Sequence, residues 1–499
     1  EVCVKNKPVK KVVVVGGGTA GWLAAASIAK LLGDNLQITL IESDEIGTIG
    51  VGEATIPTML VLHHLLKINE QEFMSAVHGS FKLGISFENW GALGDKYIHS
   101  FGVTGKGCWA AGFHHFWLKA RKLGLSGDYG NYCTELMAAK SDRFAVSVNN
   151  EKLNYAYHFD AGLYANFMRK IAEESNVRRL EGKIINVVTD EVSGFISAVR
   201  LDSGQRIEGD LFVDCSGFAS LIIDKTLNTE YDDWSNWLPC DRAIAIQTSA
   251  TSEPVPYTRS IAKDAGWQWR IPLQSRVGNG LVYCSSYITD ADAESVLLSS
   301  VDGNALTKPR LIKFRTGQRK LHWNKNCIAL GLAAGFVEPL ESTSIHMVQK
   351  GIIRLLQMFP FDGIKVADKD EFNHQMREEF LFIRDFIVLH YHLTKRTDTN
   401  FWNHCRSMAI PETLRHRLEL FRESGRIFEK DRDLFAENSW AQVMLGQGLM
   451  PAHYHPIVNM MADAELTFFL NNIESQAINR VTQLPKHQHF IDKYCKAIA

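Results

Sequence analysis

The sequence lacks the features of a membrane-spanning, secreted or nucleic-acid-binding protein. Its 499 residues carry 54 basic and 56 acidic side chains, a formal net charge of −2, so no positive excess attracts nucleic acid or an anionic membrane. The nine cysteines include no Cys-x-x-Cys pair, a pattern typical of reduced thiols and not of a disulfide framework or a zinc site. We therefore expect a cytoplasmic protein with small-molecule partners and no metal site. The cysteines are Cys3, Cys108, Cys133, Cys215, Cys240, Cys284, Cys327, Cys405 and Cys495.

Long uninterrupted apolar runs are missing as well. Segment 12–29 is uncharged, as in a signal peptide or a membrane anchor, but Gly16, Gly17, Gly18 and Gly21 interrupt it. We therefore expect neither a membrane span nor a secretion signal. With 45% hydrophobic and 22% charged residues, the composition is that of an ordinary globular protein.

Residues 11–42 contain a complete dinucleotide-binding fingerprint. A valine run at 12–15 predicts a buried strand, and glycines in Gly-x-Gly-x-x-Gly spacing follow it at once. Gly16 permits a tight turn, Gly18 lets the backbone approach a pyrophosphate, and Gly21 lets the next helix pack on the strand. Residues 22–32 predict that helix and 36–41 a second strand. The second strand ends at Glu42, which is placed to accept hydrogen bonds from a ribose diol.

Two later junctions identify the dinucleotide as FAD. Segments 209–217 and 326–335 each combine a buried strand with a following glycine turn. FAD lies extended across a sheet and uses several such junctions, whereas an NAD domain ends within about 150 residues. From their places in the fold, we expect further flavin contacts from Thr19, Ala20, Ala54 and Ile184.

Hydrophobic patterning divides the chain into two parts. Residues 1–345 are predicted to form the FAD-binding α/β body, with a helical insertion at about 61–150 and antiparallel strands at about 240–290 covering a substrate cavity. Residues 346–499 are predicted to form a mostly helical substrate or lid module. Its apolar stripe is interpreted as core, and the stripe consists of Phe380, Ile383, Ile387 and Tyr391.

Two motifs make the function specific. Residues 266–272 contain Trp-x-Trp-x-Ile-Pro, and residues 339–343 read Pro-Leu-Glu-Ser-Thr. Together with the glycine loop, they resemble the flavin-dependent halogenases of the tryptophan halogenase family. Further landmarks are Gly50 to Pro57, Phe81-Lys82 and His99 to Gly102. The resemblance implies an α/β FAD-binding fold of the GR2, aromatic-hydroxylase-like type, with a mostly helical substrate module.

The resemblance also implies the reaction. FADH2, oxygen and chloride or bromide form hypohalous acid at the flavin, and this acid passes through a tunnel to Lys82. There the lysine either hydrogen-bonds the acid or forms a haloamine, and Glu341 is its catalytic partner. An ammonium donor makes the halogen more electrophilic and a carboxylate can take the ring proton. The alternative for Lys82 is a solvated surface lysine, and for Glu341 a helix N-terminal acid.

The remaining site residues follow from the same resemblance. The backbone amides of Thr343 and Ser344 hold the halide, and many members have glycine where this chain has Ser344, which leaves chloride and bromide both open. Leu332 and Ile345 touch the isoalloxazine. His99 and Phe101 sandwich an indole ring, with packed core side chains as the alternative.

The substrate and two other functions stay open at this point. Members that accept free tryptophan grip its backbone end, and segment 433–440 has no convincing match to that grip. Indole or another indole-bearing or electron-rich aromatic compound is therefore at least as good a candidate substrate as free tryptophan, and both stay open. A separate flavin reductase and a homodimer are implied by resemblance. The alternatives are a flavin-dependent aromatic hydroxylase and a catalytically silent flavoprotein. Gly331-Leu332 argues against the hydroxylase, because hydroxylases of this fold usually have Gly-Asp there.

Overall fold

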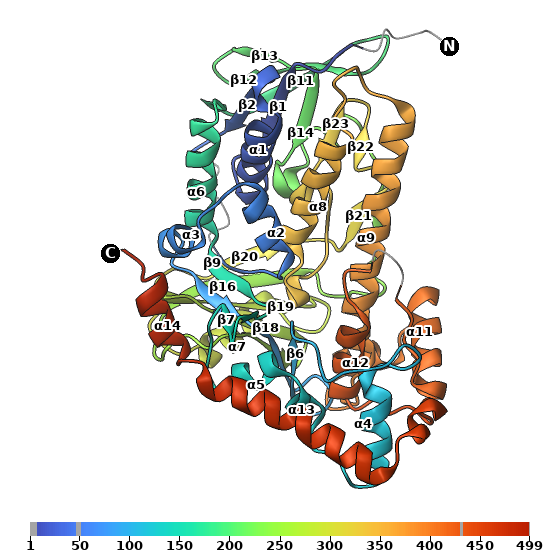
Figure 1. Cartoon of the computed structure of the whole chain (residues 1–499). Coiled ribbons are helices and arrows are strands. Elements are labelled where there is room, and N and C mark those ends of the chain that lie inside the picture. The colour runs from blue at the N-terminus through green and yellow to red at the C-terminus, as the bar shows by residue number, and fades with distance from the viewer. Residues whose placement is uncertain (1–6, 46–50, 430–432, 499) are drawn as a thin grey trace.

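The computed structural model describes residues 7–45, 51–429 and 433–498 (Figure 1). Cys3 and Gly50, which the sequence analysis names, lie outside these residues.

Within the described residues, the N-terminal part is built on a six-stranded sheet. Its first five strands pair in parallel, and β22 is an antiparallel edge strand. The valine run forms the central strand β1 because both of its faces are covered. In sheet order the strands are β10 (Arg178–Glu181), β2 (Gln37–Glu42), β1 (Lys11–Val15), β14 (Leu211–Asp214), β23 (Cys327–Ala329) and β22 (Trp323–Asn324).

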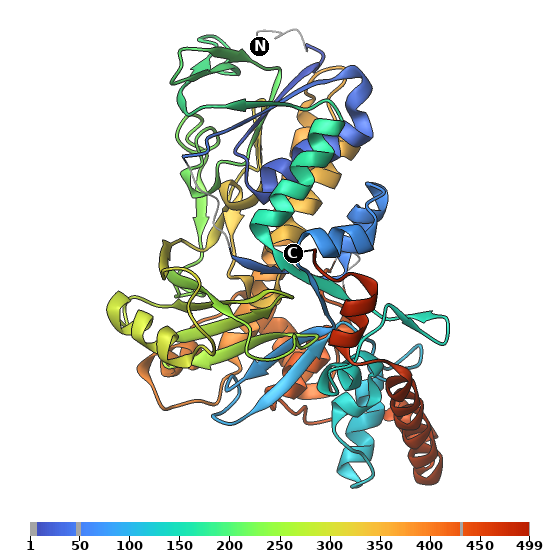
Figure 2. The same cartoon turned by 90° about the vertical axis from the view of Figure 1, so that its left-hand side faces the viewer.

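Helices α1 (Thr19–Leu32), α6 (Ala161–Glu174) and α8 (Ser344–Gln357) lie beside this sheet (Figures 1 and 2). Helix α1 packs against both others through a face rich in alanine. The predicted strand–helix–strand unit at 11–42 is therefore confirmed, with the helix beginning three residues earlier than expected.

A second, seven-stranded sheet lies below the first in Figure 1. Neighbouring strands are antiparallel except β17 and β5, which are parallel. The expected antiparallel strands at 240–290 are thus present. In order the strands are β20 (Arg310–Lys313), β16 (Arg242–Ser249), β19 (Arg276–Tyr283), β18 (Gly266–Pro272), β17 (Thr258–Lys263), β5 (Gly84–Glu88) and β6 (Lys96–Ser100).

Segment 61–150 is less helical than expected, because it also supplies β5, β6 and the short strand β4 (Ser80–Lys82). The physical reason is an alternation of period two that is typical of strands: Phe81, Leu83, Ile85 and Phe87 are all buried.

Smaller sheets complete the β structure. Strand β4 pairs with β9 (Ala156–Asp160), which also pairs with β3 (Gly52–Ala54). A meander joins β11 (Ile184–Thr189), β12 (Ile196–Leu201) and β13 (Arg206–Glu208). The remaining strands are β15 (Tyr231–Asp233), β21 (Gly317–Arg319), β24 (Gly335–Phe336), β7 (Ser147–Val148) and β8 (Glu151–Lys152).

From α8 onward the described chain is built of helices, and α9 (Val366–His392) extends from the level of the first sheet towards the second (Figure 1). The predicted stripe on α9 is core, since its four residues are at most 2% exposed. The part of the chain that the structure describes contains no helix with the length and apolar character of a membrane span. The other helices are α2 (Thr58–Leu65), α3 (Glu70–Ala76), α4 (Phe113–Lys122), α5 (Thr134–Lys140), α7 (Asp290–Ser300), α10 (Asn400–Ser407), α11 (Glu412–Ser424), α12 (Glu437–Gly446), α13 (Asp463–Gln483) and α14 (His487–Tyr494).

Candidate active site

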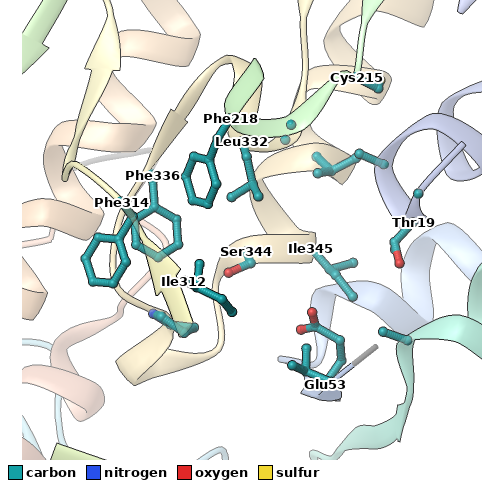
Figure 3. Close-up of a pocket in the computed structure, with 18 of the residues that line it drawn as sticks. Thr19, Glu53, Cys215, Phe218, Ile312, Phe314, Leu332, Phe336, Ser344 and Ile345 are labelled. Atoms are coloured by element: carbon teal, nitrogen blue, oxygen red, sulfur yellow. The ribbon is translucent and has the colours of Figure 1, made fainter. Parts of the chain in front are cut away.

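A cavity of about 700 Å³ lies between the two large sheets (Figure 3). It opens at the carboxyl ends of β1, β14 and β23, which are neighbours in the first sheet. The three strand-to-glycine junctions of the sequence therefore meet at one place, as expected for an extended dinucleotide. From the second sheet, β16, β18, β19 and β20 contribute the opposite wall.

The glycine loop forms one end of this cavity. Gly16 has a φ of +105°, and a Cβ there would lie 2.3 Å from Cys215 O. A Cβ on Gly21 would lie 1.8 Å from Gly16 O, so Gly21 permits close packing of α1 but does not line the cavity. Gly18 lines the cavity, and a Cβ added to it would meet no atom within 4 Å, which leaves room for a ligand at the start of α1.

Glu42 lines the same end of the cavity, at the end of β2. Its carboxylate accepts hydrogen bonds from Arg179 Nε at 2.6 Å and from Trp22 Nε1 at 3.3 Å. These two donors fix the carboxylate beside the glycine loop, where the sequence predicted a ribose-binding acid.

The other predicted flavin contacts also line the cavity, although they come from distant parts of the chain. They are Thr19, Ala20, Ala54, Ile184, Leu332 and Ile345. Trp267 and Trp269 of the Trp-x-Trp-x-Ile-Pro motif and Glu53 of the 50–57 landmark line it too. The sequence did not predict the three phenylalanines that complete the lining, namely Phe218, Phe314 and Phe336 (Figure 3). Burial raises the pKa of Glu53 to about 7.

A short loop connects this cavity to a second cluster of polar groups. Pro339–Glu341 forms a 3₁₀ turn, and Ser342 follows with a φ of +58°, a strained conformation for a residue with a side chain. Thr343 and Ser344 then begin α8 and line the flavin cavity, whereas Glu341 does not. Ser342 therefore separates the backbone amides of Thr343 and Ser344, which stand at a helix start and suit an anion, from the Glu341 carboxylate.

Lys82 is fully buried on β4, so the alternative of a solvated surface lysine is wrong. Its Nζ donates hydrogen bonds to Ser342 Oγ at 2.7 Å and to Thr55 O at 2.9 Å, and it lies 5.2 Å from the centre of the Phe101 ring. Burial lowers the pKa of Lys82 to about 7, while the charge of Glu341 opposes this shift. Because Ser342 also lines the flavin cavity, Lys82 is separated from that cavity by one side chain.

Glu341 is fully buried as well, hydrogen-bonded to His99 and within ion-pair distance of His390, so it is not a solvent-facing helix N-terminal acid. His99 Nδ1 lies 3.0 Å from Oε1 and 2.9 Å from Oε2, and His390 Nε2 lies 2.8 Å from Oε1. Burial alone raises the pKa of Glu341, but His99 and His390 lower it to about 2. The carboxylate is therefore ionised in the physiological range.

The predicted stacking residues, His99 and Phe101, lie next to Glu341 and Lys82. His99 is buried against the Phe386 and Phe435 rings, and Phe101 is half-buried beneath Lys82 Nζ. The sequence did not predict that His99 also holds Glu341. Helix α12 closes over this region, since the Gln442 amide pairs with both the N–H and the C=O of Ser100.

Segment 433–440 packs over His99 with aromatic side chains. Phe435 stacks on Phe386 with ring centres 3.9 Å apart, and Trp440 meets Phe386 edge-on. Asn438 ties this segment to Gly102 and Thr104 by hydrogen bonds. The stacked rings give this segment an apolar face towards His99, and Asn438 fixes its position.

A family model described as tryptophan halogenase matches residues 11–463. The chain belongs to the tryptophan halogenase family. It is 34% identical over 507 residues to a tryptophan 6-halogenase from Streptomyces albogriseolus, with 92% of this chain and 94% of that protein covered.

Solved halogenase structures resemble this one closely. A flavin-dependent halogenase from Xanthomonas campestris superposes with a TM-score of 0.97 at 55% identity, covering 99% of this chain and 100% of that one. A flavin-dependent halogenase from a Brevundimonas species gives a TM-score of 0.93 at 40% identity, covering 98% and 99%. The protein is thus a flavin-dependent halogenase with the predicted α/β fold, and the hydroxylase alternative is not favoured.

The cavity of this halogenase fits FAD. Gly18 leaves open space at the N-terminus of α1 for a pyrophosphate, Glu42 stands beside it for a ribose, and Leu332 and Ile345 offer apolar surface further along the cavity (Figure 3). A separate Rossmann site for a nicotinamide reductant is not evident, since the sequence has one Gly-x-Gly-x-x-Gly loop after a strand.

Proposed function

We propose that this halogenase installs chloride or bromide on an electron-rich, indole-type aromatic substrate at Lys82. The single observation that supports this most strongly is the position of the Lys82 ammonium, which is 2.7 Å from Ser342 Oγ, a residue that also lines the flavin cavity. Hypohalous acid formed in the flavin cavity has to pass only the Ser342 side chain to reach Lys82.

Bound FAD, supplied in reduced form, provides the oxygen chemistry that converts halide to hypohalous acid. The residues of the protein bind and orient this cofactor. We assign the phosphates to Gly16, Gly18 and α1, and the ribose to Glu42. The proposed isoalloxazine contacts are Ala54, Leu332 and Ile345.

The halide is assigned to the backbone amides of Thr343 and Ser344. Both residues stand at the start of the 14-residue helix α8, where unpaired N–H groups and the positive end of the helix dipole favour an anion. The Ser344 side chain narrows the space around the ion, and this is the residue we expect to decide between chloride and bromide.

Lys82 then presents the halogen to the ring. With a pKa of about 7, it is present as both ammonium and amine near neutral pH, so it can hydrogen-bond hypohalous acid or react with it to a haloamine and water. His99 and Phe101 supply flat faces for an indole ring beside it. Glu341 accepts the ring proton once the halogen is attached.

Partners and location extend the same proposal. A separate flavin reductase supplies FADH2, and a homodimer is inferred from the family. Eight described cysteines are free thiols, which supports a reducing, cytoplasmic environment. Free tryptophan lacks an evident grip for its backbone end, so indole and other indolic compounds are the first substrates to test.

The test is mass spectrometry of indole and tryptophan incubated with the enzyme, FAD, NADH, a flavin reductase and either chloride or bromide. We expect an enzyme-dependent product with the isotope pattern of the halogen added, and its yield ranks the two halides and the two substrates. A product carrying only added oxygen would contradict the proposal.

A further inference from the structure

The Trp-x-Trp-x-Ile-Pro motif has no part in the halogen transfer proposed above, although both of its tryptophans line the flavin cavity. Trp267 and Trp269 stand two positions apart on β18, so their side chains leave the same face of the second sheet. Their ring centres lie 6.2 Å apart. The motif therefore begins a series of oxidisable rings at the cavity wall.

Trp269 lies at the flavin end of this series. Its ring packs against a small apolar cluster of Ala54, Ile271 and Leu273, and Ala54 is one of the proposed isoalloxazine contacts. Gly280, opposite Trp269 on β19, provides the room for this ring, since a Cβ there would lie 2.0 Å from Trp269 Cζ2. A tryptophan in this place can lose an electron to a one-electron oxidant in the flavin cavity.

Trp267 connects the cavity wall with the protein interior, where its side chain is buried. The Trp90 ring lies 6.4 Å from the Trp267 ring and 5.3 Å from the Tyr391 ring. Trp267 Nε1 and Tyr391 OH also donate hydrogen bonds to one atom, Glu338 Oε2, at 3.3 and 2.6 Å. Two separate sets of contacts thus connect the indole of Trp267 with the phenol of Tyr391.

Tyr391 and Glu338 together can hold an oxidising equivalent. A phenol that loses an electron becomes a strong acid, so it is oxidised readily only where a base accepts its proton at once. Burial raises the pKa of Glu338 to about 7, so part of the carboxyl is ionised near neutral pH, and Oε2 already accepts the hydrogen bond of the phenol. A neutral tyrosyl radical is more stable than a tryptophan radical cation, which directs the oxidising equivalent from Trp267 to Tyr391.

The series of rings continues from Tyr391 to the surface. The Phe401 ring contacts those of Tyr391 and Tyr287, with ring centres 6.1 and 5.5 Å away. Tyr287 is 41% exposed. A reductant in solution, such as a thiol, can therefore reach the outer end of the series.

We propose that Trp269, Trp267 and Tyr391 form an electron-transfer relay that removes oxidising equivalents from the flavin cavity, with Glu338 as the proton acceptor. The oxidant is oxidised flavin in its light-excited state, which gains one electron as Trp269 loses it. Trp267 then reduces Trp269, and Tyr391 reduces Trp267 while its phenol proton moves to Glu338 Oε2. One electron from a reductant in solution and the proton returned by Glu338 restore Tyr391. The relay protects the cavity and takes no part in halogen transfer.

A flash experiment on the FAD-loaded enzyme tests the relay. Blue light excites the bound FAD, whose visible spectrum first confirms that each variant retains it, and time-resolved absorption identifies the radical that follows. We expect a tyrosyl radical in the wild-type protein, a tryptophan radical instead in Tyr391→Phe, and loss of the long-lived radical in Trp267→Phe. Tyr283→Phe is the matched control, because Tyr283 is also buried but donates to a different carboxylate, Asp290.

The absence of a tyrosyl radical in the wild-type protein, or its persistence in Tyr391→Phe, would overturn the relay. Glu338→Gln tests the proton acceptor separately. Glutamine keeps an acceptor oxygen for Tyr391 but cannot take its proton, so we expect the tryptophan radical to persist in this variant. A tyrosyl radical that forms as fast as in the wild-type protein would overturn the role of Glu338.

A second experiment measures protection. The FAD-loaded wild-type protein, Tyr391→Phe and Tyr283→Phe are illuminated in air, and oxidised tryptophan is quantified by peptide mass spectrometry. We expect several-fold more oxidation of Trp267 and Trp269 in Tyr391→Phe than in the other two proteins, and equal oxidation in all three would overturn the protective role. Neither experiment uses halide or an aromatic substrate, so its outcome is independent of the halogenation proposed at Lys82.

Discussion

Trp267 Nε1 donates a 3.3 Å hydrogen bond to Glu338 Oε2, and this bond joins the Trp-x-Trp-x-Ile-Pro strand to the loop that carries Glu341. Tyr391 OH donates to the same oxygen at 2.6 Å, and Glu338 is fully buried with its pKa raised by burial to about 7. The structure thus shows a contact that anchors the start of the loop carrying Glu341, Thr343 and Ser344.

Replacing Trp267 by Phe should therefore weaken halide binding. The variant leaves Glu338 with one donor fewer, which costs about 1–3 kcal/mol of unfolding free energy and loosens the loop before Thr343. We expect a several-fold higher KM for halide in steady-state assays. Trp402→Phe is the control, because it loses a comparable buried bond to Lys263 O and lies outside the loop. Equal halide KM values in the two variants would contradict the anchoring role.

The pH dependence of halogen transfer should report the state of Lys82. Burial lowers its pKa to about 7, so the amine fraction rises with pH through neutrality and the ammonium fraction falls. The measured quantity is the fraction of hypohalous acid that ends on the substrate, which removes the pH dependence of flavin chemistry. We expect an inflection close to neutral pH. If this fraction rises with pH, Lys82 acts as the haloamine; if it falls, the Lys82 ammonium acts by hydrogen bonding. A fraction that does not change with pH would contradict the lowered pKa of Lys82.

Ser342→Gly should shift that inflection. Glycine accepts the φ of +58° without strain, so the loop keeps its course, but Lys82 loses an acceptor that stabilises its ammonium. We expect a lower inflection pH and a loss of halogenation of about tenfold, as a hydrogen bond to a charged group contributes about 1.5–3 kcal/mol. FAD affinity, followed by fluorescence, serves as the control. An unchanged inflection would mean that Ser342 does not set the state of the lysine.

Gly18→Ala should impair FAD binding without affecting the fold. A methyl group at Gly18 meets no protein atom within 4 Å and enters the space left for the pyrophosphate, so the apoprotein should melt as the wild type does. We expect at least about a tenfold loss of FAD affinity in a fluorescence titration, since the backbone no longer approaches the phosphates. Gly33→Ala, at the other end of α1, is the matched control with free space for its methyl group. Similar FAD affinities in the two variants would show that the glycine loop is not part of the flavin site.

The flavin cavity could be predicted from the sequence because its parts are local. Each strand-to-glycine junction is recorded in a few adjacent residues, and parallel strands bring their carboxyl ends to one edge without any knowledge of side-chain packing. The strands at 80–100 were missed although Phe81 to Phe87 alternate, because the neighbouring helices dominated the pattern.

The polar cluster around Glu341 could not be derived in this way. Its members come from β4, β6, the loop before α8 and α9, and only the packed fold brings them together. One signal was present: His390 follows Ile383 and Ile387 at helical spacing, which places a titratable group on the buried face of α9. A polar residue on an apolar stripe needs partners: His390 Nδ1 donates to Phe386 O, and Nε2 lies 2.8 Å from Glu341 Oε1.

The central claim is that hypohalous acid made beside the flavin is used at Lys82. The most direct test is Lys82→Ala, assayed for product by mass spectrometry and for hypohalous acid by a chemical trap, with FAD binding measured in parallel. We predict unchanged FAD binding, continued release of hypohalous acid and no halogenated product when the free acid is scavenged. Halogenated product from this variant in the presence of the scavenger would contradict the account.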